Sequence, residues 1–146
     1  MRPDKFLMRR LSGCFSAVVL SLVFVQPASG ASGAWVADSA SLTMTQKHWF
    51  YYSEPLMAPD DSGNRMITSV GWRFEASPHP ALQAELCSTS RTRCINLGKE
   101  RGQTRAFRGL PASEVMQLRF SMPGKGRLRK DVNIKNIQVI VNYHER

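Results

Sequence analysis

The strongest constraint on the fold is an alternation of apolar and polar residues that occurs twice between positions 70 and 97. In 70–75 every second residue is apolar, which is the period-two pattern of a half-buried strand. The run 82–87 repeats the pattern. Between the two runs lies Ser77-Pro78-His79-Pro80, whose prolines cannot donate hydrogen bonds to a sheet. The region therefore predicts two strands joined as a hairpin by residues 77–80.

Alternation recurs in four further segments, which are 34–45, 104–108, 114–122 and 137–143. Glycine and proline separate several of these segments, as in the tight turn predicted at Pro123-Gly124-Lys125-Gly126. No amphipathic helix is evident after residue 30. Short strands with turn signals about every 8–12 residues indicate a β-sandwich or a small barrel. We predict an all-β fold, specifically a small antiparallel β-sandwich of about seven to eight strands.

Residues 1–31 have the pattern of a secretory signal peptide. Four basic residues lie in the first ten, a predominantly apolar run without charges follows over 11–25, and Ala28-Ser29-Gly30-Ala31 supplies small residues for cleavage. Cleavage after Gly30 and cleavage after Ala31 fit equally well. A membrane-spanning helix needs about 20 apolar residues, and this run is shorter. The expected organisation is a cleaved leader over 1–30 and a single β-sandwich domain over 31–146.

The basic residues are concentrated in the second half of the chain. Residues 31–90 contain three basic and six acidic side chains, whereas 91–135 contain twelve basic and three acidic ones. Such a surface suits an acidic protein or an anionic membrane, and nucleic acid is not expected because an exported protein rarely meets it. Alternatively, these basic residues form an ordinary solvated face that binds no partner. The candidate binding residues are Arg105, Arg108, Arg127, Arg129 and Lys130.

The most aromatic part of the chain is Lys47-His48-Trp49-Phe50-Tyr51-Tyr52. Aromatic side chains usually fill a core, so we expect this segment to pack inside the domain. The alternative is an exposed recognition surface, for which Trp49 and Tyr51 are the candidate residues.

Cysteine usage indicates one disulfide. Cys14 belongs to the predicted leader, which leaves Cys87 and Cys94 on either side of a polar six-residue segment. An even number of cysteines in an exported chain favours a disulfide. We therefore expect Cys87 and Cys94 to be bonded across the tip of a hairpin.

Signatures of catalysis and of metal binding are missing from the sequence. It contains no G-x-S-x-G, no H-E-x-x-H and no free thiol paired with a histidine. The histidines are scattered, and Asp60-Asp61 lacks the further ligand spacing of a calcium loop. We expect no enzymatic activity, no cofactor and no bound metal.

Several blocks of sequence resemble the flagellar FlhE family over about residues 33–143. These blocks are Gly33-Ala34-Trp35, Gly71-Trp72-Arg73-Phe74-Glu75, Leu86-Cys87-Ser88 with Arg93-Cys94, Pro123-Gly124-Lys125-Gly126-Arg127-Leu128, and 136–143. The resemblance implies a β-rich, non-enzymatic accessory of flagellar assembly in the periplasm.

The same resemblance implies a biological role that the composition does not show. The family is associated with limiting proton leakage through the flagellar export apparatus and with chaperoning rod subunits. The expected partners are therefore rod or export-apparatus proteins, with transient membrane contact also possible. Two alternatives remain open: a pilus-type or adhesin-type sandwich that donates or accepts a strand, and a secreted enzyme or inhibitor with an unrecognised site.

Overall fold

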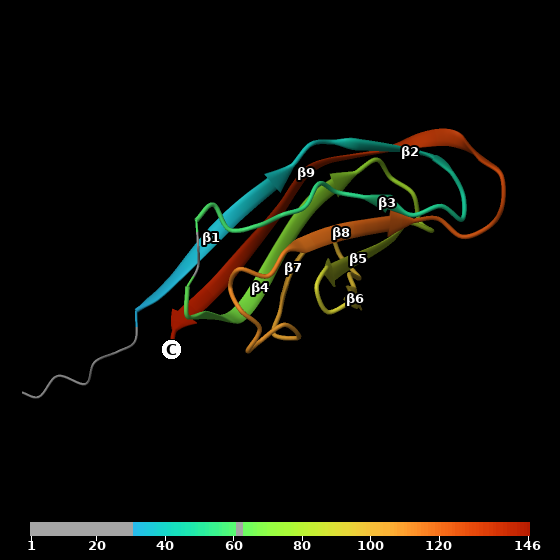
Figure 1. Ribbon diagram of the computed structural model, residues 1–146. Coiled ribbons are helices and arrows are strands. Elements are labelled where there is room, and N and C mark those ends of the chain that lie inside the picture. The colour runs from blue at the N-terminus through green and yellow to red at the C-terminus, as the bar shows by residue number, and fades with distance from the viewer. Residues whose placement is uncertain (1–30, 61–62) are drawn as a thin grey trace, which may run out of the picture.

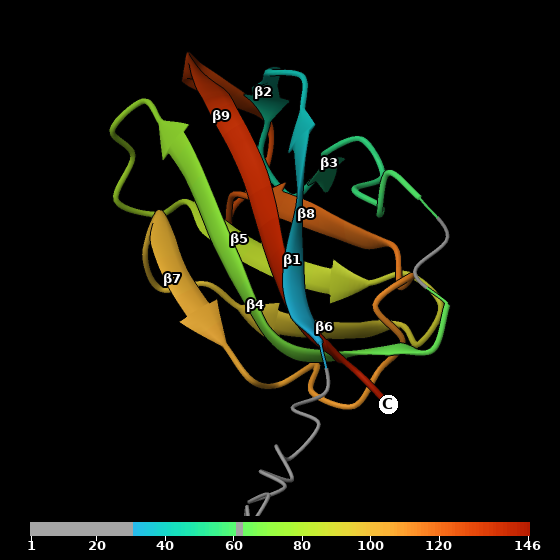
Figure 2. The same cartoon turned by 90° about the vertical axis from the view of Figure 1, so that its left-hand side faces the viewer.

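Two antiparallel sheets face each other in the structure, a computed structural model that describes residues 31–60 and 63–146 (Figures 1 and 2). The first sheet contains β1 (Ser32–Ser39), β9 (Arg127–Glu145), β4 (Arg65–Ala76) and β7 (Arg101–Thr104), with β2 (Leu42–Gln46) also paired to β9. The second has the order β3 (Tyr51–Tyr52), β8 (Met116–Ser121), β5 (Gln83–Ser88) and β6 (Arg93–Asn96). The predicted all-β sandwich is confirmed, with nine strands and no helix in the described ranges. The predicted leader lies outside these ranges.

The longest strand, β9, organises the first sheet. One of its edges pairs with β4, while the other pairs with β1 over residues 137–144 and with β2 over 127–134. The register against β4 shifts between Arg73 and Glu75, where an extra residue of β9 is accommodated. Asn136 lies in this bulge with φ of 53°, a conformation that asparagine tolerates better than most residues. The bulge divides β9 into two parts, which pair with β2 and with β1 respectively on the edge opposite β4.

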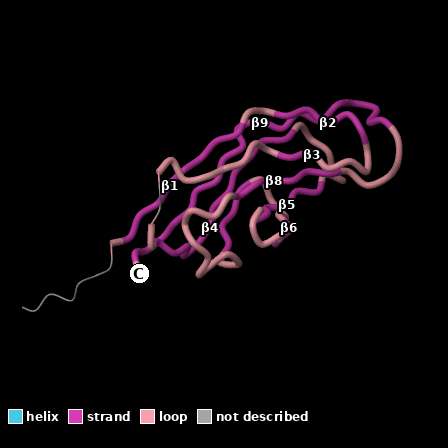
Figure 3. The backbone as a smooth tube through the Cα atoms, viewed as in Figure 1, coloured by secondary structure: helices cyan, strands magenta, loops and turns pink. Residues whose placement is uncertain are grey.

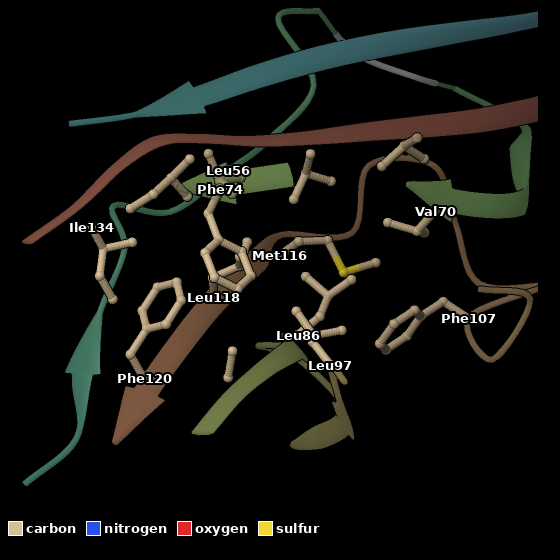
Figure 4. Packing of buried hydrophobic residues seen from close by; sticks show 14 of the residues in the cluster. Leu56, Val70, Phe74, Leu86, Leu97, Phe107, Met116, Leu118, Phe120 and Ile134 are labelled. Carbon is tan, nitrogen blue, oxygen red and sulfur yellow. The ribbon is translucent and has the colours of Figure 1, made fainter. Parts of the chain in front are cut away.

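Apolar side chains from both sheets meet in a continuous core (Figure 4). Phe74 of β4 and Phe120 of β8 pack edge to face, with ring centroids 5.1 Å apart. Trp35 of β1 is also buried, and its Nε1 donates a hydrogen bond to the Ala112 carbonyl at 2.8 Å. That bond satisfies the one polar atom of the indole and ties β1 to the segment that precedes β8.

The connection over residues 77–80 crosses between the sheets, so the predicted hairpin of 70–75 with 82–87 is wrong. Both runs are strands, but β4 belongs to the first sheet and β5 to the second. The alternation identified which side chains face the core, and it carries no information on which strands pair. Glu75 and Glu85 consequently lie on different sheets, and each has a cationic partner, Lys135 and Arg119 respectively.

The strand predicted at 104–108 is displaced. The strand that pairs with β4 is β7, which ends at Thr104, and a turn follows in which the Arg108 amide donates to the Arg105 carbonyl at 3.0 Å. Phe107 is fully buried from this turn. A single buried ring in a turn produces the same short alternation as a strand, which explains the error. The early segment 34–45 likewise forms two strands, β1 and β2, with a break at Ala40 and Ser41.

The expected bond between Cys87 and Cys94 is present. The two cysteines are directly opposed partners in the β5–β6 hairpin, with their Cα atoms 4.0 Å apart. Residues 89–92 form the turn between them. The bond therefore joins positions that the backbone ladder already brings together.

Two glycines make room for aromatic rings across neighbouring strands. Gly102 of β7 is the register partner of Trp72, and a Cβ added at Gly102 would overlap the indole. The Trp72 Nε1 donates to the Lys99 carbonyl at 3.0 Å, which holds the ring over the glycine. Gly33 of β1 has the same relation to Tyr143 of β9. Glycine at these positions is required by the space that the rings occupy.

We predict that replacing both cysteines by serine, Cys87→Ser with Cys94→Ser, lowers the free energy of unfolding by roughly 2 kcal/mol, because the bond closes only a short loop. Urea denaturation followed by fluorescence measures the change. Reduction of the wild-type protein should produce the same loss. Equal stability of the oxidised and reduced forms would contradict the prediction.

We also predict that Gly102→Val destabilises the protein by about 1–3 kcal/mol, because the indole of Trp72 must leave its position. Gly71→Ala is the matched control on the adjacent strand, since a Cβ there meets no atom closer than 3.6 Å. Urea denaturation should show the control to be as stable as the wild type. A valine variant that matches the control would show that the Trp72 packing contributes nothing.

Candidate functional site

The five predicted basic residues are all exposed, but the fold separates them into two groups. Arg105 and Arg108 follow the end of β7, which lies beside the part of β4 that pairs with Val141 of β9. Arg127, by contrast, is the first residue of β9. Arg127 and Val141 are fourteen positions apart, which corresponds to roughly 45 Å of extended strand, less any bending. Arg105 and Arg108 therefore cannot share one patch with the other three.

The other three, together with Lys47 and Lys125, form what we call the basic tip: Lys47, Lys125, Arg127, Arg129 and Lys130. It is built from the β2–β3 connection, the β8–β9 connection and the start of β9. The two connections lie at the same end of the molecule (Figure 3). Two backbone hydrogen bonds join them: the Lys47 amide donates to the Gly126 carbonyl at 2.8 Å, and the His48 amide donates to the Met122 carbonyl at 2.7 Å. In the sequence, Lys47 is far from the other four cations and was therefore not among the predicted binding residues. Only these two hydrogen bonds identify it as part of the basic tip.

The charge of the basic tip is not neutralised within the described part of the chain. The four salt bridges found there involve none of its five cations. Asp131 is the only acidic residue between positions 122 and 134. The tip is thus a local concentration of positive charge that can attract an anionic surface or ligand.

The expectation that the aromatic segment packs in the core is wrong for three of its four rings. The exposed fractions are 64% for Trp49, 53% for Phe50 and 51% for Tyr52. Tyr52 pairs with Arg119 and faces outward, whereas Tyr51 is its inward neighbour on the two-residue strand β3. Because β3 is so short, it provides only one inward position, and the other rings remain on the surface.

Tyr51, one of the predicted binding residues, has a structural role. Its hydroxyl accepts hydrogen bonds from the backbone amides of Thr45 and Gln46, at 3.1 and 2.9 Å, and so ties β3 to the end of β2. Burial acts to raise the pKa of the phenol, but the hydrogen bonds from these two residues outweigh it and lower the pKa. Of the two aromatic candidates, only Trp49 is therefore available to a partner.

A groove of about 470 Å³ lies on the outer face of the second sheet, beside the basic tip. Arg119 of β8 is its most strongly fixed side chain. The guanidinium lies 4.4 Å from the centroid of the Phe50 ring and contacts the Glu85 carboxylate through Nη2 at 2.6 Å and Nε at 2.7 Å. The residues that line the groove are His48, Phe50, Gln83, Glu85, Asn96, Arg119, Ser121, Met122, Pro123 and Gly124.

The register of the second sheet places three of these side chains in one row with Tyr52. Tyr52 is paired with Arg119, Arg119 with Glu85, and Glu85 with Asn96, which crosses all four strands. Burial acts to lower the pKa of Arg119, but the contacts with Glu85 and Tyr52 more than offset it and raise the pKa. We call Phe50 together with this row the aromatic–arginine row. It presents a fixed cation between exposed rings.

One polar residue of the interior was not anticipated from the sequence. Glu114, only 7% exposed, accepts hydrogen bonds from the hydroxyls of Ser88 at 2.5 Å and Ser90 at 2.6 Å, and from the Ser90 amide at 3.2 Å. Burial acts to raise the pKa of its carboxyl, but these bonds outweigh that effect and lower the pKa. Glu114 therefore anchors the turn of the disulfide-bonded hairpin. Within the described residues no group of acidic, histidine or cysteine side chains is arranged to hold a metal.

The profile of the flagellar protein FlhE family matches residues 41–144, which include both the basic tip and the aromatic–arginine row. The chain belongs to the FlhE family of flagellar proteins. The resemblance carried by the sequence blocks is thereby confirmed.

Relatives and a solved structure agree with this assignment. The flagellar protein FlhE of Escherichia coli K12 is 35% identical over 129 residues, which cover 87% of this chain and 95% of that protein. The FlhE protein of Yersinia enterocolitica is 34% identical over 140 residues, 92% of this chain and 94% of the relative. A crystal structure of FlhE superposes with a TM-score of 0.70 at 34% identity and covers 78% of this chain and 98% of that one. The sandwich is therefore the fold of the family.

We predict that Glu114→Gln lowers the free energy of unfolding by about 1–2 kcal/mol at neutral pH, because an amide cannot satisfy all three donors. The pKa of Glu114 in the folded protein lies below its ordinary value of 4.5. Its contribution is therefore complete above about pH 4.5 and is lost as the pH falls through the folded-state pKa. Urea denaturation between pH 7 and pH 3 should show a smaller pH dependence in the variant. Glu75→Gln, an exposed control, should leave both quantities nearly unchanged; equal behaviour of the two variants would refute the prediction.

Proposed function

We propose that this protein is a non-catalytic accessory of flagellar assembly that acts in the periplasm and binds a component of the flagellar rod or of the export apparatus. Membership of the FlhE family supports the flagellar role. The leader pattern of residues 1–30 supports export, with the single domain of residues 31–146 as the mature form. No helix in the described residues is long and apolar enough to cross a membrane.

The aromatic–arginine row is the observation that carries the binding role. Tryptophan, tyrosine and arginine are the residues that most often dominate the energy of a protein interface. Phe50 and Tyr52 are about half exposed, with ring centroids 6.4 Å apart, and the Arg119 guanidinium lies over Phe50. Since Glu85 already neutralises and orients Arg119, a partner can cover the row without immobilising a free charged side chain.

The groove that this row lines suits an extended or loop segment of a rod or export-gate protein. Its polar groups, from Gln83, Asn96 and Ser121, can pair with the backbone of such a segment while Phe50 contacts an apolar side chain. If this protein binds such a segment at the periplasmic mouth of the export channel, it would shield the apolar surface of a rod subunit. It would also obstruct the flow of protons through the channel. Both consequences require binding and no chemistry.

The test is a double variant, Phe50→Ala with Tyr52→Ala, in purified periplasmic protein. We predict at least a tenfold weaker affinity for purified rod subunits or export-gate components, because two exposed rings leave the centre of the interface. Both side chains are about half exposed, so thermal unfolding should change little. Val36→Ala, which removes an exposed apolar side chain of the first sheet, serves as the control and should bind as the wild type does.

The same variants should be expressed in a strain from which the gene has been deleted. The double variant should fail to restore swimming and cytoplasmic pH, whereas Val36→Ala should restore both. Full restoration by the double variant would show that the row is not the binding site. A deletion strain with normal swimming, normal pH and normal rod assembly would overturn the proposed function itself.

A further inference from the structure

We propose that the basic tip is a second, separate binding surface, and that it docks on the headgroups of an anionic lipid bilayer with Trp49 at the interface. This inference goes beyond the proposed function, because it concerns a different ligand and different residues. It is argued from the position, the pairing and the exposure of the side chains at this end of the sandwich.

The first argument is the concentration of unpaired charge at one end of the molecule. Lys47 and Lys125 come from two connections that are far apart in the sequence, and backbone hydrogen bonds hold these connections together. Arg127, Arg129 and Lys130 continue the charge along the start of β9. Figure 1 shows this end opposite the labelled C-terminus. A flat anionic surface can approach such an end directly, and lysine and arginine are the residues it attracts.

The second argument is the exposed tryptophan beside these cations. Trp49 directly follows the turn at Lys47 and His48, and its side chain is 64% exposed, the largest exposure of any bulky hydrophobic residue described. Tryptophan is enriched at membrane interfaces because its ring is apolar while its N–H remains hydrated. An exposed tryptophan next to unpaired cations therefore has the composition of an interfacial anchor.

The third argument distinguishes a lipid surface from an acidic protein. Arg119 in the neighbouring groove is held by Glu85 at 2.6 Å, as suits recognition of a defined partner. The cations of the basic tip have no ion pair in the described structure, so no carboxylate fixes their position. Lipid headgroups are laterally mobile and bind a loose group of cations without a fixed geometry. The charge pattern therefore fits a bilayer better than a folded acidic partner.

Docking by the tip would leave the groove accessible. Pro123 and Gly124 of the β8–β9 turn line one end of the groove, so the groove begins next to the tip and continues away from it along the second sheet. A protein bound to the aromatic–arginine row would then be held close to the membrane surface without competing for the basic tip. The two surfaces could be occupied together.

The experiment is co-sedimentation of the purified periplasmic protein with vesicles of phosphatidylcholine alone or mixed with phosphatidylglycerol. We expect binding to the mixed vesicles only, with loss of binding as salt is raised, because salt screens the headgroup charge. Arg127→Glu with Arg129→Glu and Lys130→Glu should weaken binding at least tenfold. The matched control reverses the same number of charges elsewhere: Arg101→Glu, Arg105→Glu and Arg108→Glu, after which binding should stay within about threefold of the wild type. Circular dichroism checks that both variants are folded.

Trp49 provides an independent readout. Vesicles should shift the tryptophan emission of the wild type to shorter wavelength, and Trp49→Phe should abolish the shift while Trp35 and Trp72 remain. Failure to bind the mixed vesicles, or equal losses in the two charge-reversal variants, overturns the proposal. The tip variant could instead bind vesicles normally but no longer bind a purified acidic flagellar protein. That result would overturn the lipid proposal and identify the acidic protein as the ligand of the basic tip. The Phe50→Ala, Tyr52→Ala variant should still bind vesicles, so failure of the two proposals can be told apart.

Discussion

The backbone pairing along both edges of β9 is the interaction on which the rest of the structure depends. One edge pairs with β4, and the other pairs first with β2 and then with β1, so β9 contacts three of the four other strands in its sheet. Its inward residues Ile137, Val139 and Val141 are fully buried. The bulge at Asn136 allows the strand to change direction without leaving its partners. Because the strand starts at Arg127, its position also determines where the basic tip lies.

The second sheet depends on register in a different way. A shift of β8 by one residue against β5 would turn Arg119 toward the core, expose Leu118 and remove Glu85 as the partner of Arg119. The buried leucines therefore select the register that places the ion pair outside, in line with Tyr52 and Asn96. The hydrogen bonds from Thr45 and Gln46 to the Tyr51 hydroxyl also fix the surface, because they hold β3, and with it Tyr52, at the end of the row. The same strand register thus determines both the packing of the core and the side chains of the candidate binding surface.

Alternation predicted the strands and their inward faces because burial repeats every second residue in a sheet. Met116, Leu118 and Phe120 of β8 are all fully buried, as the pattern indicates. It could not predict the crossing at residues 77–80, because pairing depends on contacts between distant segments. The same limit applies to the candidate site. Lys47 joins the basic tip only through its hydrogen bond to Gly126, and Glu114 meets Ser88 and Ser90 only after the hairpin has formed.

The two ends of the sandwich differ in how their cations are compensated, and this difference bears on how the molecule meets a partner. Near the C-terminus, Arg65 lies between Asp60 at 3.6 Å and Glu145 at 4.0 Å, and its guanidinium is 5.0 Å from the centroid of the Tyr143 ring. At the basic tip, Asp131 is the one nearby carboxylate in the sequence and forms no salt bridge in the described structure. The five cations of the tip therefore produce a positive field that no salt bridge of the described structure reduces. Such a field attracts the molecule to an anionic surface and also rotates it so that the tip faces that surface before contact is made. An anionic surface would then meet the tip first, with the groove of the second sheet already beside it.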